Sequence, residues 1–248
     1  MIQTSNLNKD FDGKHAVCDL NLSIAAGECF CFLGPNGAGK TTTIKMLTGL
    51  LQPTSGRAVI AGHDIQKEPE RAKAHIGYIP DRPYLYEKLS GRDYFTFIGD
   101  LFGIDRDKQR QLMEHYFELF ELTAATDQFI ENYSHGMRQK LVFAAALMHE
   151  PSVLVVDEPM VGLDPQSVRT VKKLLRAEAD TGRTVFLSTH TLSVAEELAD
   201  RIGVIHKGKL LFLGTIQELR NTLDREGNLE ELFLLLTKEE EPHPEGGW

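Results

Sequence analysis

Short apolar runs recur along the chain, each free of charged side chains, and they predict buried strands. The clearest are Cys29–Leu33, Val153–Val156, Thr184–Ser188 and Ile202–Ile205. Runs of this length are typical of strands that are covered on both faces of a sheet. Because segments with helical spacing separate them, we expect an α/β core with a mostly parallel sheet and flanking helices.

The first thirty residues follow a different pattern, in which apolar and polar positions alternate. The apolar positions are Val17, Leu20, Leu22 and Ile24. Turn residues interrupt the pattern at Asp12-Gly13 and at residues 26–28. Such alternation predicts an N-terminal antiparallel β-subdomain. Further strands are expected near residues 58–61 and 75–79, and a helix is expected over Thr41–Leu50, closed by Gly49.

Between about residues 84 and 149 the spacing of apolar positions becomes helical. Within Lys108–Leu122 the recurring positions are Leu112, His115, Tyr116, Leu119 and Phe120. This spacing places them on one face of a helix. We therefore expect a helical subdomain, about residues 84–149, inserted in a domain that spans residues 2–231.

A C-terminal segment, residues 232–248, follows that domain. Its end, from Lys238 onward, is acidic and contains proline and glycine, which is typical of a solvated tail. Just before it, residues 229–236 read LEELFLLL and predict a helix with an apolar face. That face could pack on the core or on a partner.

Composition excludes few classes of function. The 248 residues carry a formal net charge of -9, which argues weakly against nucleic-acid binding, because a local basic patch is compatible with a negative total. No run approaches the roughly 20 apolar residues that cross a bilayer, and the N-terminus lacks the apolar core of a secretory signal. We therefore expect a cytoplasmic protein. Cys18, Cys29 and Cys31 are expected to be free, and the last two to pack as small core residues.

A glycine-rich loop after the first apolar run fits the phosphate-binding pattern G-x-x-x-x-G-K-S/T. Its glycines allow consecutive backbone N–H groups to surround phosphate oxygens, and the following helix adds the positive end of its dipole. Lys40 would neutralise the β- and γ-phosphates, and the Thr41 hydroxyl would ligate magnesium. The predicted nucleotide-binding residues are Gly34, Pro35, Asn36, Gly37, Ala38, Gly39, Lys40, Thr41 and Thr42.

Two carboxylates end the second apolar run. Asp157 follows Val153–Val156 and is expected to hold magnesium through water, as in other P-loop NTPases. Glu158 comes next, and strand alternation predicts that its side chain points the other way. A second carboxylate there suits a general base that polarises the attacking water.

Further motifs follow in a fixed order and complete a resemblance. Residues 133–140 read YSHGMRQK, residues 162–165 read GLDP after Asp157-Glu158-Pro159, and Ser188-Thr189-His190 comes last. Together with the P-loop, this order and spacing resemble the ATP-binding cassette (ABC) ATPases over roughly residues 2–220. The resemblance implies a P-loop NTPase core with ATP and Mg²⁺ as cofactors.

The resemblance also assigns roles to single residues. Ser134 and Gly136 match the signature motif, usually L-S-G-G-Q, which caps the γ-phosphate bound by a second cassette. His190 matches the switch histidine that contacts the γ-phosphate, and Asp164 falls in the loop that crosses the dimer interface. Phe11 matches the aromatic residue that stacks on adenine, with packing in the core as the alternative.

The sequence departs from the family pattern at two motifs. His135 replaces the first glycine of the signature motif and Met137 replaces its glutamine. Asp81 stands where the family has the Q-loop glutamine, which reaches magnesium and senses the membrane partner. Asp81 is therefore expected either to serve magnesium or to act as a turn residue before Arg82-Pro83.

These features imply an ATPase that powers a membrane transporter. The expected partners are a second cassette, identical or paralogous, and a separately encoded permease that holds the chain on the inner face of the membrane. Exposed aromatic residues at 84–86 are candidates for that contact, with packing inside the insertion as the alternative. The signature variant is similar to that of bacterial exporters. A non-transport ABC ATPase that acts on DNA or ribosomes is the alternative, although we expect no nucleic-acid partner.

Overall fold

The predicted parallel strands form one six-stranded sheet in the computed structural model, which describes residues 1–222. The strand order is β10-β9-β3-β8-β7-β6, and only the pair β10–β9 is antiparallel. The strands are β3 (Cys29–Leu33), β6 (Ile76–Ile79), β7 (Val153–Asp157), β8 (Thr184–Thr189), β9 (Arg201–His206) and β10 (Lys209–Gly214). The domain boundary at 231, the helix at 229–236 and the tail from Lys238 lie outside the described residues.

The N-terminal antiparallel sheet is also confirmed. Its order is β2-β1-β4-β5, from β1 (Ile2–Phe11), β2 (Lys14–Ile24), β4 (Ser55–Ile60) and β5 (His63–Asp64). The turn Asp12-Gly13 joins β1 to β2 with positive φ at both residues, which a tight hairpin favours. The alternating residues Val17, Leu20, Leu22 and Ile24 are all buried, because they share the face that covers the core.

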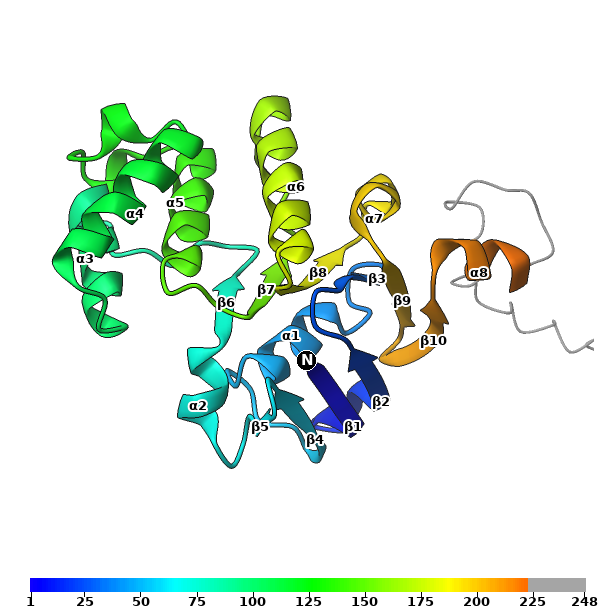
Figure 1. Ribbon diagram of the computed structural model, residues 1–248. Coiled ribbons are helices and arrows are strands. Elements are labelled where there is room, and N and C mark those ends of the chain that lie inside the picture. Colours follow the sequence, from blue (N-terminus) through cyan, green and yellow to red (C-terminus); the bar gives the residue numbers. More distant parts are fainter. Residues whose placement is uncertain (223–248) are drawn as a thin grey trace, which may run out of the picture.

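Helices cover both faces of the large sheet (Figure 1). Helix α1 (Lys40–Leu47) contacts strands of both sheets, whereas α6 (Pro165–Asp180) and α7 (Leu192–Leu198) pack on β3 and β8. Helices α2 (Pro69–Ala74) and α8 (Ile216–Thr222) lie near β5 and β10. Helix α1 ends earlier than predicted, because Thr48 closes it and Gly49 adopts a φ of 67°.

The segment between β6 and β7 is helical and stands to one side of the sheets (Figure 1). It contains α3 (Gly91–Leu101), α4 (Arg106–Leu119), the 3₁₀ turns η1 (Thr123–Ala125) and η2 (Ile130–Asn132), and α5 (His135–Leu147). Helix α5 packs against α3, α4 and β6, so it links this helical subdomain to the core. Buried aromatic side chains fill the subdomain: Phe95, Tyr116, Phe117, Phe120 and Phe143. The predicted fold class is confirmed.

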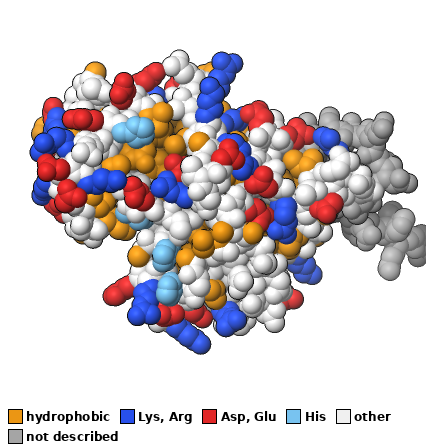
Figure 2. All heavy atoms as spheres, in the orientation of Figure 1, with side chains coloured by type: hydrophobic (Ala, Val, Ile, Leu, Met, Phe, Trp, Pro, Cys, Tyr) orange, Lys and Arg blue, Asp and Glu red, His pale blue; other side chains and the backbone are white. Residues whose placement is uncertain are grey.

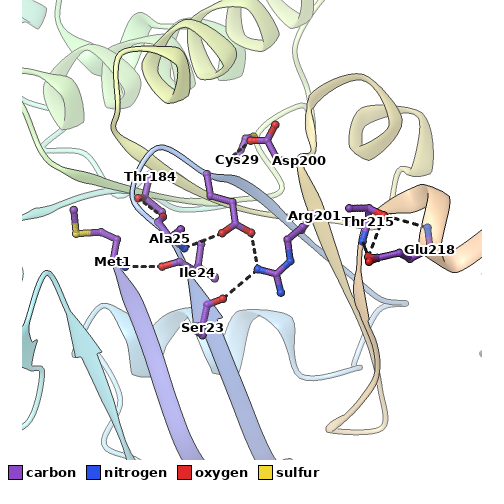
Figure 3. A network of polar contacts seen from close by, with 11 residues as sticks. Met1, Ser23, Ile24, Ala25, Cys29, Thr184, Asp200, Arg201, Thr215 and Glu218 are labelled. Atoms are coloured by element: carbon purple, nitrogen blue, oxygen red, sulfur yellow. Dashed lines mark hydrogen bonds and ion pairs between the residues drawn. The ribbon is translucent and has the colours of Figure 1, made fainter.

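Polar contacts fix the end of the sheet where the parallel strands begin (Figure 3). The Arg201 guanidinium donates to the Glu28 carboxylate at 2.9 Å and to the Ser23 carbonyl at 3.2 Å. Glu28 also accepts from the Ala25 amide, and Asp200 accepts from the Cys29 amide, each at 2.8 Å. These charged side chains are therefore paired with groups of the fold itself. Ligands of α/β sheets bind at the opposite end, where the parallel strands finish.

Within residues 1–222, the structure contains no helix with the length and apolar character needed to span a bilayer. The face in Figure 2 carries acidic and basic side chains intermixed, without an extended basic region. Cys18, Cys29 and Cys31 are free thiols, and Cys29 and Cys31 are buried in the core as expected.

Candidate nucleotide-binding site

A cavity of about 600 Å³ lies at the carboxyl end of β3, where the P-loop begins. Ligands of α/β sheets bind at this end of the strands. The cavity brings together P-loop residues with Phe11, Asp81 and Glu158, which the sequence had placed in one site. Its lining residues are Phe11, Lys14, His15, Ala16, Pro35, Asn36, Gly37, Gly39, Lys40, Thr41, Thr42, Asp81, Glu158 and Lys207.

The P-loop is shaped by glycines that no larger residue could replace. A Cβ atom on Gly34 would lie 2.5 Å from the Ile205 carbonyl oxygen. Gly39 has a φ of 113°, and a Cβ there would lie 2.5 Å from the Ala16 carbonyl oxygen. These close approaches seat the loop on β9 and β2, with its backbone turned toward the cavity. Gly34 and Ala38 belong to the loop without lining the cavity.

Lys40 begins α1 and is buried, with 6% of its side chain exposed. Its Nζ donates to the carbonyl oxygens of Gly34 at 2.6 Å and Pro35 at 3.3 Å. The Glu158 Oε1 atom lies 3.3 Å from the same Nζ and has no hydrogen-bond partner, so this contact is an ion pair without hydrogen-bond geometry. A buried ammonium group therefore faces the cavity within reach of an incoming phosphate.

Glu158 does not continue strand β7, although the prediction for its side chain assumed strand alternation. Strand β7 ends at Asp157, and Glu158 adopts a left-handed backbone with a φ of 47°. This conformation breaks the alternation and turns the carboxylate into the cavity. Its Oε2 atom lies 3.0 Å from Nδ1 of His190, so Glu158 joins Lys40 to His190.

Asp157 is almost fully buried at the end of β7. One oxygen accepts a hydrogen bond from the Ser188 hydroxyl, while Oδ2 has no partner. Burial raises the pKa of Asp157, hydrogen bonds from Ser188 and Thr41 oppose the shift, and the carboxylates of Glu158 and Asp81 add to it. A buried carboxylate with one unpaired oxygen, close to the Thr41 hydroxyl, fits a hard divalent cation.

Asp81 lines the cavity in the bend after β6. Burial raises the pKa of Tyr78 to about 12, with further contributions from Asp157 and Asp81, which locates both carboxylates near this ring. Among residues 1–222, no group of three or more His, Cys, Asp or Glu side chains could hold a metal. A cation would therefore need hydroxyl, phosphate and water oxygens beside the carboxylates.

Phe11 stands at the rim of the cavity with 45% of its surface exposed. Lys9 Nζ lies 4.9 Å from the centre of the ring, and its hydrogen bond to the Gln52 carbonyl holds it there. A ring exposed at the mouth of a phosphate site is available for stacking on a base. The alternative, that Phe11 packs in the core, is therefore not supported.

Ser134 and Gly136 lie outside the P-loop cavity of their own chain. Ser134 is exposed and caps α5, where its hydroxyl accepts from the Met137 amide at 3.2 Å. A Cβ on Gly136 would meet nothing closer than the Gly162 carbonyl at 3.7 Å, and Gly136 does not have a positive φ. Glycine weakens a helix by about 1 kcal/mol relative to alanine, and no contact among residues 1–222 explains why glycine stands here.

Several of the residues that line the cavity were not predicted from the sequence. Lys207 lines the cavity from the turn between β9 and β10, whose Gly208 amide donates to the Ala38 carbonyl at 2.8 Å. Lys14, His15 and Ala16 come from β2. The hydrogen bond from Ser188 to Asp157 was not predicted either, although the parallel register sets the two residues side by side. The Lys-Gly turn gave no signal beyond that of an ordinary hairpin.

Comparisons with known proteins agree with this geometry. Residues 17–161 match the family described as ABC transporter. The linearmycin resistance ATP-binding protein LnrL of Bacillus subtilis (strain 168) is 37% identical over 223 residues, which cover 90% of this chain and 72% of LnrL. The daunorubicin/doxorubicin resistance ATP-binding protein DrrA of Streptomyces peucetius is 40% identical over 222 residues, covering 90% and 67%.

A solved structure described as the ATP binding subunit of an ABC transporter superposes with a TM-score of 0.91 at 29% identity. The match covers 96% of this chain and 100% of that one. The family match spans more than half of the chain, and it includes both the P-loop and the end of β7. The chain therefore belongs to the ABC transporter family, and it is an ATPase of that family.

Proposed function

We propose that this chain is the ATP-hydrolysing subunit that powers a membrane exporter, by closure of a dimer of cassettes around ATP. The observation that carries the proposal is the arrangement of Lys40, Glu158 and His190 at the mouth of the P-loop, beside the unpaired carboxylate oxygen of Asp157. Both compared relatives are named for resistance to an antibiotic or a cytotoxic drug, which supports outward transport.

In the proposed mechanism the P-loop amides and Lys40 bind the phosphates of ATP. The phosphate competes with Glu158 for the Lys40 ammonium, so binding frees the carboxylate for catalysis. Glu158 then orients a water in line with the γ-phosphate and accepts its proton, while His190 holds the carboxylate at Oε2. Phe11 stacks on the base.

Magnesium fits this site and would be held by Thr41 and Asp157, with Asp81 contributing through water. When bound, it supplies positive charge that stabilises the transferred phosphoryl group. The unpaired Oδ2 of Asp157 is the atom best placed for it, because no protein donor competes for that oxygen.

One chain carries only half of the proposed site. Ser134 and Gly136 lie away from the P-loop of their own chain. A glycine at position 136 is explained if a second chain brings the γ-phosphate of its ATP against the start of α5. A side chain at this position would obstruct the phosphate. The proposed partner is therefore a second cassette, identical or paralogous.

The proposed permease contact is an aromatic groove of about 510 Å³ on the helical subdomain. Tyr84 and Tyr86 expose 88% and 61% of their surfaces, and Phe97 and Leu101 are also exposed. Exposed aromatic and aliphatic side chains that gather in one groove are typical of protein interaction sites. Docking there would hold the chain at the inner face of the membrane.

Co-purification tests the transport function. We expect a tagged chain, expressed in its native host and extracted in mild detergent, to retain a polytopic membrane protein. The double variant Tyr84→Ser/Tyr86→Ser should lose at least ~90% of that protein and keep its basal ATPase activity, because neither ring touches the nucleotide cavity. Matched substitution of Phe129, exposed elsewhere on the subdomain, serves as control. Recovery of ribosomal RNA or DNA instead would favour the non-transport alternative.

A further inference from the structure

His135 stands between two parts of the molecule. It is the first residue of α5, it is exposed, and it follows the capping Ser134. Its ring occupies the space that a side chain at position 162 would take: a Cβ on Gly162 would lie 2.3 Å from Cδ2 and 2.8 Å from Nε2. The imidazole is therefore packed directly on the backbone of Gly162, which has a φ of 76°.

Gly162 lies in the β7–α6 loop, residues 158–164. The loop begins at Glu158 and ends at Asp164, whose carboxylate caps α6 by accepting from the Gln166 and Ser167 amides at 3.0 Å each. Two turn hydrogen bonds tighten it, from Val161 to Glu158 at 3.3 Å and from Leu163 to Met160 at 3.4 Å. A contact at Gly162 therefore acts on a short, constrained segment that carries the catalytic carboxylate at its start.

Tyr133, the residue before Ser134, is anchored in the helical subdomain and not on the β7–α6 loop. The Tyr133 hydroxyl donates to the Ala125 carbonyl at 2.7 Å in the interior of the helical subdomain. A Cβ on Gly91 would lie 2.2 Å from this hydroxyl, so the glycine at the start of α3 makes room for it. Ser134 is thus flanked by one neighbour fixed to the helical subdomain and one packed on the core.

We infer that His135 is a positioning residue, which fixes the spacing between Ser134 and the β7–α6 loop of the same chain. The inference rests on the proposed function, in which Ser134 contacts the ATP of one half-site and Glu158 serves the other. Through the imidazole on Gly162, a shift of α5 on nucleotide contact moves the loop of Glu158. The two half-sites then respond together, and ATP hydrolysis is cooperative in ATP concentration.

Steady-state ATPase kinetics test the inference. We expect His135→Gly to lower kcat ~3- to 10-fold and to bring the Hill coefficient for ATP toward 1. The affinity of the chain for ADP should be unchanged. His135→Gln, which keeps a planar side chain of similar reach, should restore at least half of kcat. His115→Ala, an exposed histidine of α4, should match the unmodified chain. An unchanged kcat and Hill coefficient in His135→Gly would overturn the inference.

A charge role for His135 makes a different prediction. In that case His135→Gln would be as impaired as His135→Gly, because neither side chain carries a charge. That outcome would also overturn the positioning role.

A double-mutant cycle tests the contact itself. Gly162→Ala should lower kcat strongly, both because its Cβ enters the imidazole and because a side chain is strained at a φ of 76°. In the His135→Gly background only the strain remains, so the cost should be smaller. Equal losses in both backgrounds would contradict the contact. The same cycle read by thermal unfolding does not depend on dimerisation. If Glu158→Gln forms no ATP-bound dimer, the proposed function fails, while the cycle still reports on His135.

Discussion

The chemistry of the site depends on single atoms that receive no hydrogen bond from the protein, although the Glu158 oxygen is ion-paired with Lys40. Oδ2 of Asp157 and Oε1 of Glu158 are buried and accept no hydrogen bond. Buried unpaired carboxylate oxygens are costly in a folded protein, and such cost is tolerated where a ligand will compensate it. At the residue scale, therefore, the nucleotide-free site is destabilised in a way that ATP and magnesium would relieve.

Asp157 gives this idea a measurable pH dependence. Burial raises its pKa in the folded state, so the unfolded chain releases the proton at lower pH than the folded chain. The resulting penalty on folding is absent below the ordinary carboxyl pKa, grows as the pH rises toward the folded-state pKa, and is complete above it.

Asp157→Asn removes this penalty. We expect the nucleotide-free variant to gain a few degrees in Tm at pH 7.5, each kcal/mol being worth roughly 2–4 °C in a chain of this size. The gain should shrink as the pH is lowered, and Mg-ATP should no longer stabilise the variant. Asp81→Asn should raise Tm less, since it removes only a neighbouring charge. Thermal scans at several pH values check this, with Glu114→Gln as the exposed control. A lower Tm for Asp157→Asn would contradict the account.

At the scale of elements, the start of α3 packs against the end of η2 through the contact of Gly91 with Tyr133. Gly91 leaves space for the Tyr133 hydroxyl, which satisfies the carbonyl of Ala125 in η1. The signature motif follows directly, so its position depends on this fit.

Gly91→Ala should therefore destabilise the chain by about 1–3 kcal/mol, the usual cost of overpacking. Combining it with Tyr133→Phe should recover part of the loss, because the clashing oxygen is gone, while about 1 kcal/mol for the lost hydrogen bond remains. The Ala125 carbonyl still accepts from the Gln128 amide in that variant. Urea unfolding of both single variants and the double variant measures this. A double variant whose loss equals the sum of the single losses would show that the pair does not interact.

The elements themselves follow from the sequence with few exceptions. Apolar runs such as Val153–Val156 predict the parallel strands, because a strand that is covered on both faces of its sheet needs apolar side chains at nearly every position. The left-handed backbone of Glu158 could not be predicted, since strand alternation applies only while the strand continues and β7 stops one residue earlier. The contact of His135 with Gly162 is likewise invisible in the sequence, because it joins segments brought together only by the fold.

The candidate site was predictable where a local motif defines it. The P-loop, Asp157 and His190 are contiguous with strands whose ends meet at one edge of the sheet, so their proximity follows from topology. Lys14, Ala16 and Lys207 reach the cavity from the other sheet and from a hairpin turn, and only tertiary packing brings them there.

At the scale of the whole molecule, the central claim is that the chain is half of an enzyme. Its P-loop and its signature motif are separate surfaces of one chain, and no contact among residues 1–222 requires a glycine at position 136. Two copies facing each other would bring each P-loop against the other's Ser134. Assembly, and not only the residues of one cavity, would then control hydrolysis.

Glu158→Gln tests this claim most directly, with nucleotide content and molecular mass measured together in the presence of ATP and magnesium. The substitution keeps the shape of the side chain but removes the base, so ATP should bind and persist. The account predicts a stable species with the mass of two chains and two ATP molecules, which dissociates when Ser134→Glu is added. A Glu158→Gln chain that stays monomeric with ATP bound, or unmodified chains that turn over fully as monomers, would contradict it.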